Sequence, residues 1–418
     1  MIVLLDGAVE MAESCLRAIA AGGDSVPSET VIVLNDPDSS LEDLVGKGTT
    51  GAEIAVTRAN AGVSVGWNLG ASIARAPRLA TLHEDSEPDV GWLAPLCEAM
   101  TESGAGVVGS RLYNLDGTVQ NSGCVLFSDA NPRPIDELNA PEVVAARDPT
   151  PVDYISGAAM LLDRDAVRAA GGWDERFQPA VFADVDISLA MWSQGRPVLS
   201  VPASSVRHRR GALAHREKSA LTGPLLNPFL FLRNRDRFIS KWGALVRSLA
   251  PPSADLQPES IRAAVRAALS LTRERAEGIR SGLWRPPGPP ARAERRFTGV
   301  SEPLLDQGNG THSVAAEVEA ALDVAELELV DEYCRWLTRE EECRSAELRE
   351  VRMELEHRNG ELAGLRVHAE AAQRHSRDLE LELDRVAHSF TWRLRTLVRR
   401  VVRAPLALFR RRRRASET

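Results

Sequence analysis

The sequence has few cysteines and no long apolar run, and both shortages exclude classes of protein. Its 5 cysteines among 418 residues are scattered and odd in number, with no Cys-x-x-Cys spacing, so neither a disulfide framework nor a zinc site is indicated. No apolar stretch approaches the ~20 residues that a membrane-spanning helix needs. The first residues have no basic segment and turn acidic at Asp6, unlike a secretory signal peptide. These features favour a reducing, cytoplasmic compartment.

The chain is too long for one average domain, and its charge is unevenly distributed. Hydrophobic residues make up 44% of it, which is typical of a globular protein with at least one sizeable core. The formal net charge is -8, yet residues 385–416 contain many arginines and no acid. We therefore expect several structural units, and we expect the basic C-terminal segment to have a different kind of binding partner from the rest of the chain.

Up to about residue 245, short apolar runs alternate with helix-like runs. Strands are expected at IVLL, TVIVLND, EIAVTR and LATLHED, and helices near residues 12–21 and 66–76. Strands that alternate with helices predict an α/β domain with a mainly parallel sheet. Ligands of such sheets bind at the carboxyl ends of the strands, where we expect Asp6, Asp36, Glu84 and Asp85.

Beyond this domain the sequence pattern changes three times. A helical extension is expected at residues 246–285, followed by a proline- and glycine-rich linker at residues 286–312. Residues 313–388 carry a heptad seam, which favours a self-associating coiled coil over a single amphipathic helix folded onto the catalytic domain. Residues 389–418 interleave apolar side chains with arginines, a pattern that favours an anionic membrane surface over nucleic acid.

Two clusters place small or acidic residues where a nucleotide could bind. Asn60, Gly62 and Asn68 surround an expected helix start, where glycines let the backbone approach a phosphate at the helix N-terminus. The alternative is an ordinary glycine-rich helix entry. Glu84 and Asp85 end a strand, and carboxylates there can hold a divalent cation, although a solvated acidic loop is the other interpretation.

The segment VFADVDISLAMWSQG, residues 181–195, raises a question about buried charge. Asp184 and Asp186 stand at the start of an apolar helix, where an unpaired carboxylate would be costly. Acids in a first helical turn can also simply stabilise the helix dipole. His208 follows the next expected strand, and a lone histidine is more often structural than a ligand.

The order and spacing of these clusters resemble those of the family 2 glycosyltransferases with the GT-A fold, in particular a bacterial rhamnosyltransferase-like branch. The resemblance covers about residues 1–245. The family pattern N-x-G-x-x-x-x-x-N-x-G is matched at residues 60–70, and an acidic motif followed by Gly-Trp-Leu at residues 84–93. The patterns S-G-x-x-x-L and G-G-W-D-E are matched at residues 156–161 and 171–175.

The resemblance implies a role for each matched position. Asp184 would be the general base that accepts the proton of the acceptor hydroxyl in an inverting displacement. Asp85 and His208 would hold Mn²⁺ or Mg²⁺, which offsets charge on the departing nucleoside diphosphate. The implied donor-binding residues are Asp6, Asp36, Asn60, Gly62, Asn68, Glu84 and Asp85. The implied acceptor-binding residues are Gly157, Trp173, Asp174 and Asp186.

Partners are implied as well. The expected donor is a nucleotide sugar, dTDP-rhamnose or a UDP-hexose, and the acceptor a cell-surface polysaccharide or a polyprenyl-linked glycan. We expect a homo-oligomer formed through the coiled coil, peripheral contact with the anionic inner face of the cell membrane, and no nucleic acid. Ala183 stands where the family commonly has Glu, which leaves a catalytically silent nucleotide-binding scaffold as the alternative function.

Overall fold

A computed structural model describes most of the chain up to residue 283 and a few positions beyond it. The described residues are 1–6, 8–22, 26–48, 51–57, 61–137, 148–209, 227–255, 257–283, 311–313 and 332. Asn60 lies outside them, as do nearly all of the expected linker and coiled coil and the whole basic tail. The chain divides into two compact units, Met1–Tyr333 and Cys334–Thr418, and every described residue belongs to the first.

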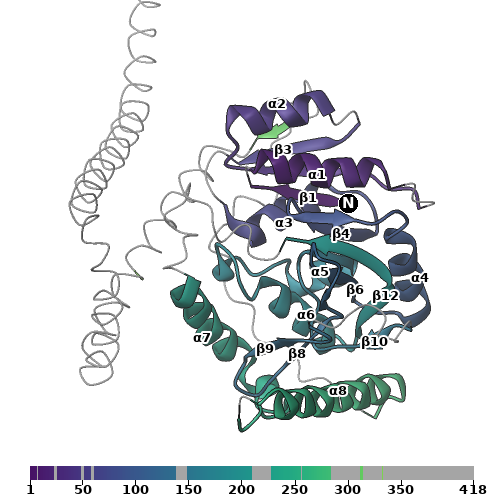
Figure 1. Cartoon of the computed structure of the whole chain (residues 1–418), viewed down its shortest axis with the longest axis vertical. Coiled ribbons are helices and arrows are strands. Elements are labelled where there is room, and N and C mark those ends of the chain that lie inside the picture. The colour runs from purple at the N-terminus through teal and green to yellow at the C-terminus, as the bar shows by residue number, and fades with distance from the viewer. Residues whose placement is uncertain are drawn as a thin grey trace, which may run out of the picture. The chain divides into compact units, whose positions relative to one another are not determined.

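The first unit is built on a mixed, mostly parallel β-sheet (Figure 1). Its strands are β1 (Ile2–Leu5), β2 (Val31–Asn35), β3 (Glu53–Thr57), β4 (Arg78–His83), β5 (Ser86–Pro88), β6 (Val107–Tyr113), β7 (Val119–Asn121), β10 (Thr150–Pro151), β11 (Ala159–Asp163), β12 (Val198–His208) and β13 (Thr311–Ser313). Their order is β10-β12-β6-β11-β4-β1-β2-β3-β13, with β5 paired to β12 and β7 to β6. Two further strands, β8 (Cys124–Leu126) and β9 (Pro132–Pro134), form a separate hairpin-like pair.

The direction of the strands decides where a ligand site can form. β1, β2, β3 and β4 run parallel to one another, and β6 runs parallel to β12. Between these two groups lies β11, which is antiparallel to both β4 and β6. The carboxyl ends of β1, β2, β3, β4, β6 and β12 therefore lie along one edge, as the α/β prediction requires.

Helices alternate with these strands, as the sequence predicts. They are α1 (Val9–Ala20), α2 (Ser39–Gly48), α3 (Gly62–Ile73), α4 (Leu93–Ser103), α5 (Arg164–Ala170), α6 (Ala183–Ser193), α7 (Asn227–Val246) and α8 (Pro258–Arg280), with a short 3₁₀ helix η2 (Glu175–Phe177). α3 begins one turn before its expected start, because the Pro179 carbonyl accepts a hydrogen bond from the Val63 N–H at 2.8 Å and so satisfies a donor of the first turn. No helix among the described residues is long and apolar enough to cross a membrane.

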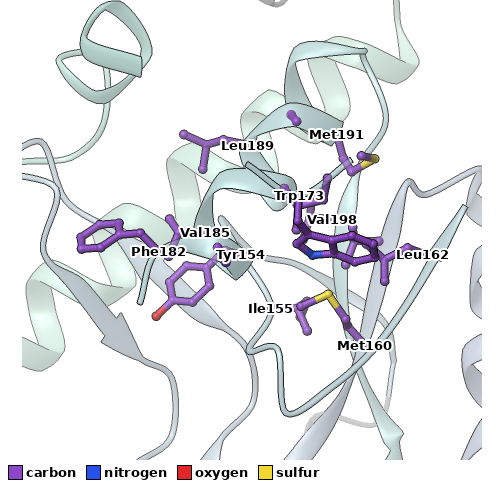
Figure 2. Close-up of a cluster of buried hydrophobic side chains, with 14 of the residues drawn as sticks. Tyr154, Ile155, Met160, Leu162, Trp173, Phe182, Val185, Leu189, Met191 and Val198 are labelled. Atoms are coloured by element: carbon purple, nitrogen blue, oxygen red, sulfur yellow. The ribbon is translucent and has the colours of Figure 1, made fainter. Parts of the chain in front are cut away.

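Both faces of the sheet are buried, which explains the unbroken apolar run in β1. Ile2 and Leu4 belong to one hydrophobic cluster, which includes residues of α3, α5 and α6. Val3 and Leu5 belong to a second cluster with residues of α1, α2 and α4. Successive side chains of a strand point to opposite faces, so a four-residue strand supplies both cores. Figure 2 shows part of the first cluster, to which Trp173, Met191 and Phe182 belong.

Close packing of α3 on β1 depends on two glycines one turn apart. A Cβ atom at Gly66 would lie 2.7 Å from Leu4 Cδ1, and one at Gly70 would lie 2.4 Å from Ile2 Cγ2. Neither distance is compatible with a real side chain, so these glycines allow the helix to approach the strand. The glycines that the sequence associates with ligand binding are thus partly explained by packing.

The helical extension expected at residues 246–285 is α8, and it packs on the α/β domain. Its Thr272 Oγ1 and Arg275 Nη1 donate hydrogen bonds to Asp153 Oδ1 at 2.8 and 2.9 Å. Asp153 is buried and its second oxygen accepts from the Leu126 N–H at 2.8 Å. Because a buried carboxylate needs such partners, α8 is an integral part of the first unit.

Candidate active site

Most of the residues singled out in the sequence gather at the carboxyl edge of the sheet. Asp6 follows β1, Asp36 follows β2, and Glu84 and Asp85 follow β4. His208 is the last residue of β12 and reaches the same edge. The parallel order of the strands brings them together from distant parts of the chain.

Glu84 shapes the turn after β1. Its Oε2 accepts a hydrogen bond from the Asp6 N–H at 2.7 Å, and both of its oxygens lie 3.3–3.4 Å from the Ala8 nitrogen. The side chain is buried. These contacts support the backbone that presents Asp6, while the predicted contact of Glu84 with the donor stays a prediction.

Asn35, which the sequence did not mark, connects three strand ends. Its Nδ2 donates to Asp6 Oδ1 at 2.7 Å, and its Oδ1 accepts from Thr57 Oγ1 at 3.0 Å and from the Ala61 N–H at 2.8 Å. The neighbouring Asp36 is exposed and has a φ of 53°. The signal for Asn35 was its position as the last residue of a buried strand, where a polar side chain turns inward.

Asp85 and His208 face each other across the edge. His208 Nε2 lies 3.4 Å from Asp85 Oδ2, and the Arg209 N–H donates to the Asp85 carbonyl at 2.9 Å. Asp85 is 3% exposed, and its Oδ1 has no hydrogen-bond partner among the described residues. Burial raises the pKa of Asp85, but the hydrogen bond from His208 and the charges of His83 and His208 outweigh it and leave the pKa below its ordinary value.

This pair fits a divalent cation. A carboxylate oxygen and an imidazole nitrogen are both common ligands, and two neighbouring ligands of one ion with bonds of about 2.1 Å stand roughly 3 Å apart. Asp85 Oδ1 is buried without a hydrogen bond, with His83 Nδ1 4.0 Å away, and can accept a further positive partner. Among the described residues no group of three or more such side chains surrounds one point. The other ligands would therefore come from a donor molecule or water.

Asp184 lies in the first turn of α6 and is held by backbone N–H groups. Its Oδ2 accepts from the Gly157 N–H at 3.1 Å and its Oδ1 from the Val185 N–H at 2.9 Å. Gly157 stands just before β11, whose Ala159 pairs with Leu82 of β4, so the carboxylate lies beside the carboxyl end of β4. Burial raises the pKa of Asp184 although the N–H groups oppose it. A partly exposed carboxylate with a raised pKa suits a general base.

The chain enters α6 through a strained turn. Val181 and Phe182 have φ angles of 74° and 73°, which side chains with a Cβ rarely adopt. Asn234 of α7 is completely buried, and its Nδ2 lies 2.8–3.1 Å from the carbonyl oxygens of Phe177, Ala180 and Val181. The signal for Asn234 was its place in the helical pattern, where a polar residue occupies a position on the apolar face.

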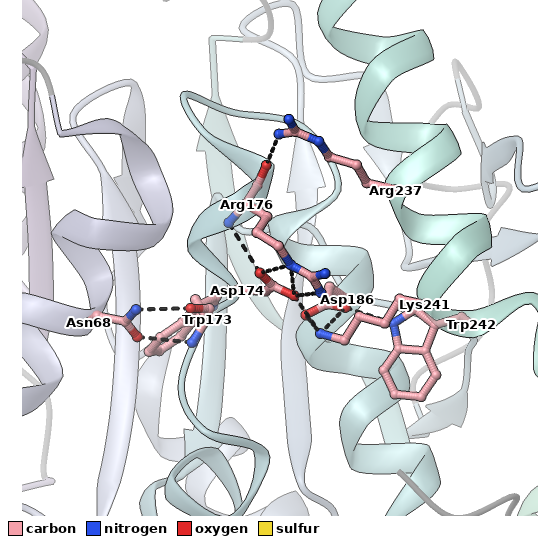
Figure 3. A network of polar contacts seen from close by, with 8 residues as sticks. All are labelled: Asn68, Trp173, Asp174, Arg176, Asp186, Arg237, Lys241 and Trp242. Carbon is pink, nitrogen blue, oxygen red and sulfur yellow. Dashed lines mark hydrogen bonds and ion pairs between the residues drawn. The ribbon is translucent and has the colours of Figure 1, made fainter. Parts of the chain in front are cut away.

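The buried charge of Asp186 is compensated by neighbouring side chains (Figure 3). It is 2% exposed, its Oδ2 lies 2.8 Å from Lys241 Nζ, and its Oδ1 accepts from Trp242 Nε1 at 2.7 Å. Lys241 Nζ also lies 2.9 Å from Asp174 Oδ2, and Arg176 pairs with the same carboxylate. Burial lowers the pKa of Lys241, but Asp186 and Asp174 outweigh it and raise that pKa above its ordinary value.

Asn68, Gly62 and Trp173 join α3 to the turn after α5. The Asn68 amide forms two hydrogen bonds of 2.9 Å with the backbone of Trp173 (Figure 3). Its Nδ2 also donates to Glu175 Oε1 at 2.8 Å. Trp173 is buried, and a Cβ at Gly62 would lie 2.8 Å from the Pro179 carbonyl oxygen. Protein contacts therefore account for these residues, and for Asp174 and Asp186, without a ligand. Their donor and acceptor roles stay predictions.

Comparison with known protein families gives a match in the N-terminal part of the chain. Residues 10–169 match the family model described as Glycosyl transferase family 2, so the chain carries a domain of this family. The matched segment contains Asn68, Asp85 and Gly157, whereas Asp184 and His208 lie beyond it.

Individual proteins resemble the chain over part of their length. Polypeptide N-acetylgalactosaminyltransferase 11 of Xenopus tropicalis is 27% identical over 222 residues, which are 48% of this chain and 36% of that protein. The crystal structure of GalNAc-T7 with UDP, GalNAc and Mn²⁺ matches with 15% identity and a TM-score of 0.45, over 69% of this chain and 59% of the other. The crystal structure of S. aureus TarS matches with 12% identity and a TM-score of 0.38, over 67% and 55%.

Proposed function

We propose that the chain is a metal-dependent, inverting glycosyltransferase that moves a sugar from a nucleoside diphosphate donor to a hydroxyl group. The family 2 domain supports sugar transfer from a nucleotide sugar. The observation that carries the proposal is a single sheet edge where Asp85 and His208 face each other and Asp184 is anchored beside the end of β4. Because an acid for the metal site, Asp85, and an acid for the general base, Asp184, are both present, we prefer the catalytic function to a catalytically silent scaffold.

In this mechanism Asp184 accepts the proton of the acceptor hydroxyl as that oxygen attacks the anomeric carbon. The bond between the anomeric carbon and the phosphate oxygen breaks on the opposite side, which inverts the configuration. The N–H groups of Gly157 and Val185 fix the direction of the carboxylate. Asp85 and His208 would hold the Mn²⁺ or Mg²⁺ ion, whose chemistry when bound is to neutralise charge on the leaving diphosphate.

The proposed donor sugar, acceptor and partners are inferred from the sequence and from its relatives. The resemblance to rhamnosyltransferase-like proteins supports dTDP-rhamnose, and the name of the curated relative, an N-acetylgalactosaminyltransferase, supports a hexose donor. The proposed acceptor is a cell-surface polysaccharide or a lipid-linked glycan. Self-association through residues 313–388 and contact of residues 389–418 with an anionic inner membrane face are proposed from their sequence patterns.

The test is release of nucleoside diphosphate from a panel of UDP-, GDP- and dTDP-sugars, with Mn²⁺ or Mg²⁺ against EDTA and with candidate acceptors. Replacement of Asp184 by Asn removes the base, so we expect transfer to fall by at least about 100-fold. The control is Asp165→Asn on α5, whose side chain is 89% exposed, and it should leave transfer unchanged. Full transfer activity in the Asp184→Asn enzyme would exclude the proposed base.

A further inference from the structure

A buried glutamine stands directly behind the proposed metal ligand His208. Gln120 of β7 is 3% exposed, and both ends of its amide contact the histidine. Its Oε1 lies 2.7 Å from His208 Nδ1, and its Nε2 donates to the His208 carbonyl oxygen at 3.0 Å. The same Nε2 donates to Asn114 Oδ1 at 3.0 Å, so both N–H bonds of the amide are used.

These contacts determine which way the Gln120 amide points. A backbone carbonyl can only accept a hydrogen bond, so the amide end beside the His208 carbonyl must be the NH₂ group. The opposite end is then the amide oxygen, which can only accept. His208 Nδ1 therefore carries the proton that Gln120 Oε1 accepts.

The ring orientation leaves a lone pair at the other nitrogen of the neutral imidazole. That nitrogen, Nε2, faces Asp85 Oδ2 at 3.4 Å, and the other oxygen of Asp85 has no hydrogen-bond partner among the described residues. Two lone pairs at this distance repel each other unless a positive charge lies between them. The charge is either a proton on an imidazolium ring or a metal ion.

We infer that Gln120 is a positioning residue that keeps a proton on His208 Nδ1 and so leaves Nε2 as the ligand for a divalent cation beside Asp85. Ligand histidines generally donate their second N–H to a carboxylate, a carbonyl or water, and loss of that partner weakens metal binding. Here a side-chain amide takes that place. The inference rests on the metal site of the proposed function.

The strand pairing fixes the position of Gln120 relative to His208. β7 and β12 both pair with β6, where Leu112 has Asn121 of β7 and Val206 of β12 as partners. The glutamine and the histidine are thus attached to one common strand. The sequence showed nothing of the pairing, because 88 residues separate Gln120 from His208.

The tautomer can be measured without metal and without activity. Long-range ¹H–¹⁵N spectra of the histidine side chains distinguish the two neutral tautomers, and the spectrum of His208→Asn identifies the signal of His208 among the 8 histidines. We expect His208 Nδ1 to carry a proton in the metal-free wild type, whether or not Nε2 shares a second proton with Asp85, and we expect Nδ1 to lose that proton in Gln120→Leu. A wild type in which Nδ1 carries no proton, or an Nδ1 that stays protonated in Gln120→Leu, would overturn the inference.

Cation binding is tested by titration with Mn²⁺, alone and with UDP, with free Mn²⁺ followed by electron paramagnetic resonance. Gln120→Leu should weaken Mn²⁺ binding about 10- to 100-fold. Gln120→Glu should bind Mn²⁺ more tightly than Gln120→Leu but less tightly than the wild type, because a carboxylate also accepts from Nδ1–H but cannot donate to the His208 carbonyl and Asn114 Oδ1. The control is Gln194→Leu. Gln194 is a partly buried glutamine whose Nε2 donates to the Ala166 carbonyl at 3.0 Å, away from the carboxyl edge of the sheet.

The outcomes separate two kinds of failure. Equal Mn²⁺ affinity in Gln120→Leu and the wild type would overturn the role of Gln120 and leave the proposed metal site intact. A wild type that binds no Mn²⁺ under either condition would overturn the metal site and with it the ligand role of His208. Loss of affinity in Gln120→Leu, with affinity partly restored in Gln120→Glu and preserved in Gln194→Leu, supports the inference.

Discussion

At the scale of single residues, the two acids at the start of α6 have different surroundings although one residue separates them. Asp186 is neutralised by Lys241 and held by Trp242 in the protein interior. Asp184 is partly exposed, and backbone N–H groups rather than a cation hold its oxygens. One carboxylate thus stabilises the fold, while the other is available for proton transfer.

The raised pKa of Asp184 predicts a pH-dependent cost in stability. A carboxyl group whose pKa is higher in the folded than in the unfolded state contributes stability below the unfolded pKa, and this contribution is lost as the pH rises through the folded pKa. Asp184→Asn removes the ionisation. The difference in Tm, variant minus wild type, should therefore be more positive at about pH 7 than at about pH 4. Thermal unfolding at both pH values measures it, and equal differences would contradict the raised pKa.

The sequence could predict residues that belong to a local pattern but not those defined by a distant partner. Asp184 and Asp85 follow from their motifs and from their places at a helix start and a strand end. Asn35 and Gln120 act through Ala61 and His208, which are 26 and 88 residues away. Since only the fold brings such pairs together, no spacing in the sequence reveals them.

At the scale of elements, α7 is the support of α6 and of the turn before it. Asn234 binds the carbonyl groups of the strained turn, and Lys241 and Trp242, two turns later on α7, bind Asp186. Phe238 of the same helix packs against Phe182 with ring centroids 5.1 Å apart. The part of α7 in positioning α6 depends on tertiary contacts between residues far apart in the sequence.

Lys241→Met should destabilise the protein because it leaves Asp174 and Asp186 without their shared cation. Removal of one partner from a buried ion pair costs about 3–5 kcal/mol, and the side chain of Lys241 is only 18% exposed. The control Arg17→Met breaks the exposed pair with Glu13 and should cost less than about 1 kcal/mol. Chemical denaturation gives both free energies of unfolding.

A second replacement separates charge from packing in that experiment. In Lys241→Met with Asp186→Asn the buried charge is removed together with its partner, so part of the stability should return. If Lys241→Met costs no more than Arg17→Met, the network in Figure 3 does not hold α7 to α6.

At the scale of the whole molecule, the structural unit is longer than the catalytic domain that the sequence pattern outlines. The alternation of strands and helices ends near residue 245, yet α8 supplies two of the partners of buried Asp153. Farther on, β13 pairs with β3, and Glu332 lies 2.7 Å from Arg237 Nη2 on α7. Contacts over such separations are invisible in composition, whereas the parallel sheet and its active edge follow from the pattern of strands.

Truncation should therefore show where the folded unit ends. A chain that ends at Tyr333 contains every described element, so we expect its Tm and its release of nucleoside diphosphate to equal those of the full chain. A chain that ends at residue 245 loses Thr272 and Arg275, which leaves Asp153 a buried carboxylate with fewer donors. It should unfold at a clearly lower temperature or fail to remain in solution.

A third truncation and a measurement of mass complete the argument. Ending the chain at Leu283 keeps α8 but removes β13 and Glu332, so its Tm should fall between those of the other two truncated chains. If the heptad seam forms a coiled coil, light scattering should give an oligomer for the full chain and fewer chains per particle for residues 1–333. Equal stability of the chains ending at 245 and 333 would show that α8 adds nothing to the fold. An equal number of chains per particle for the full chain and for residues 1–333 would instead exclude self-association through the seam.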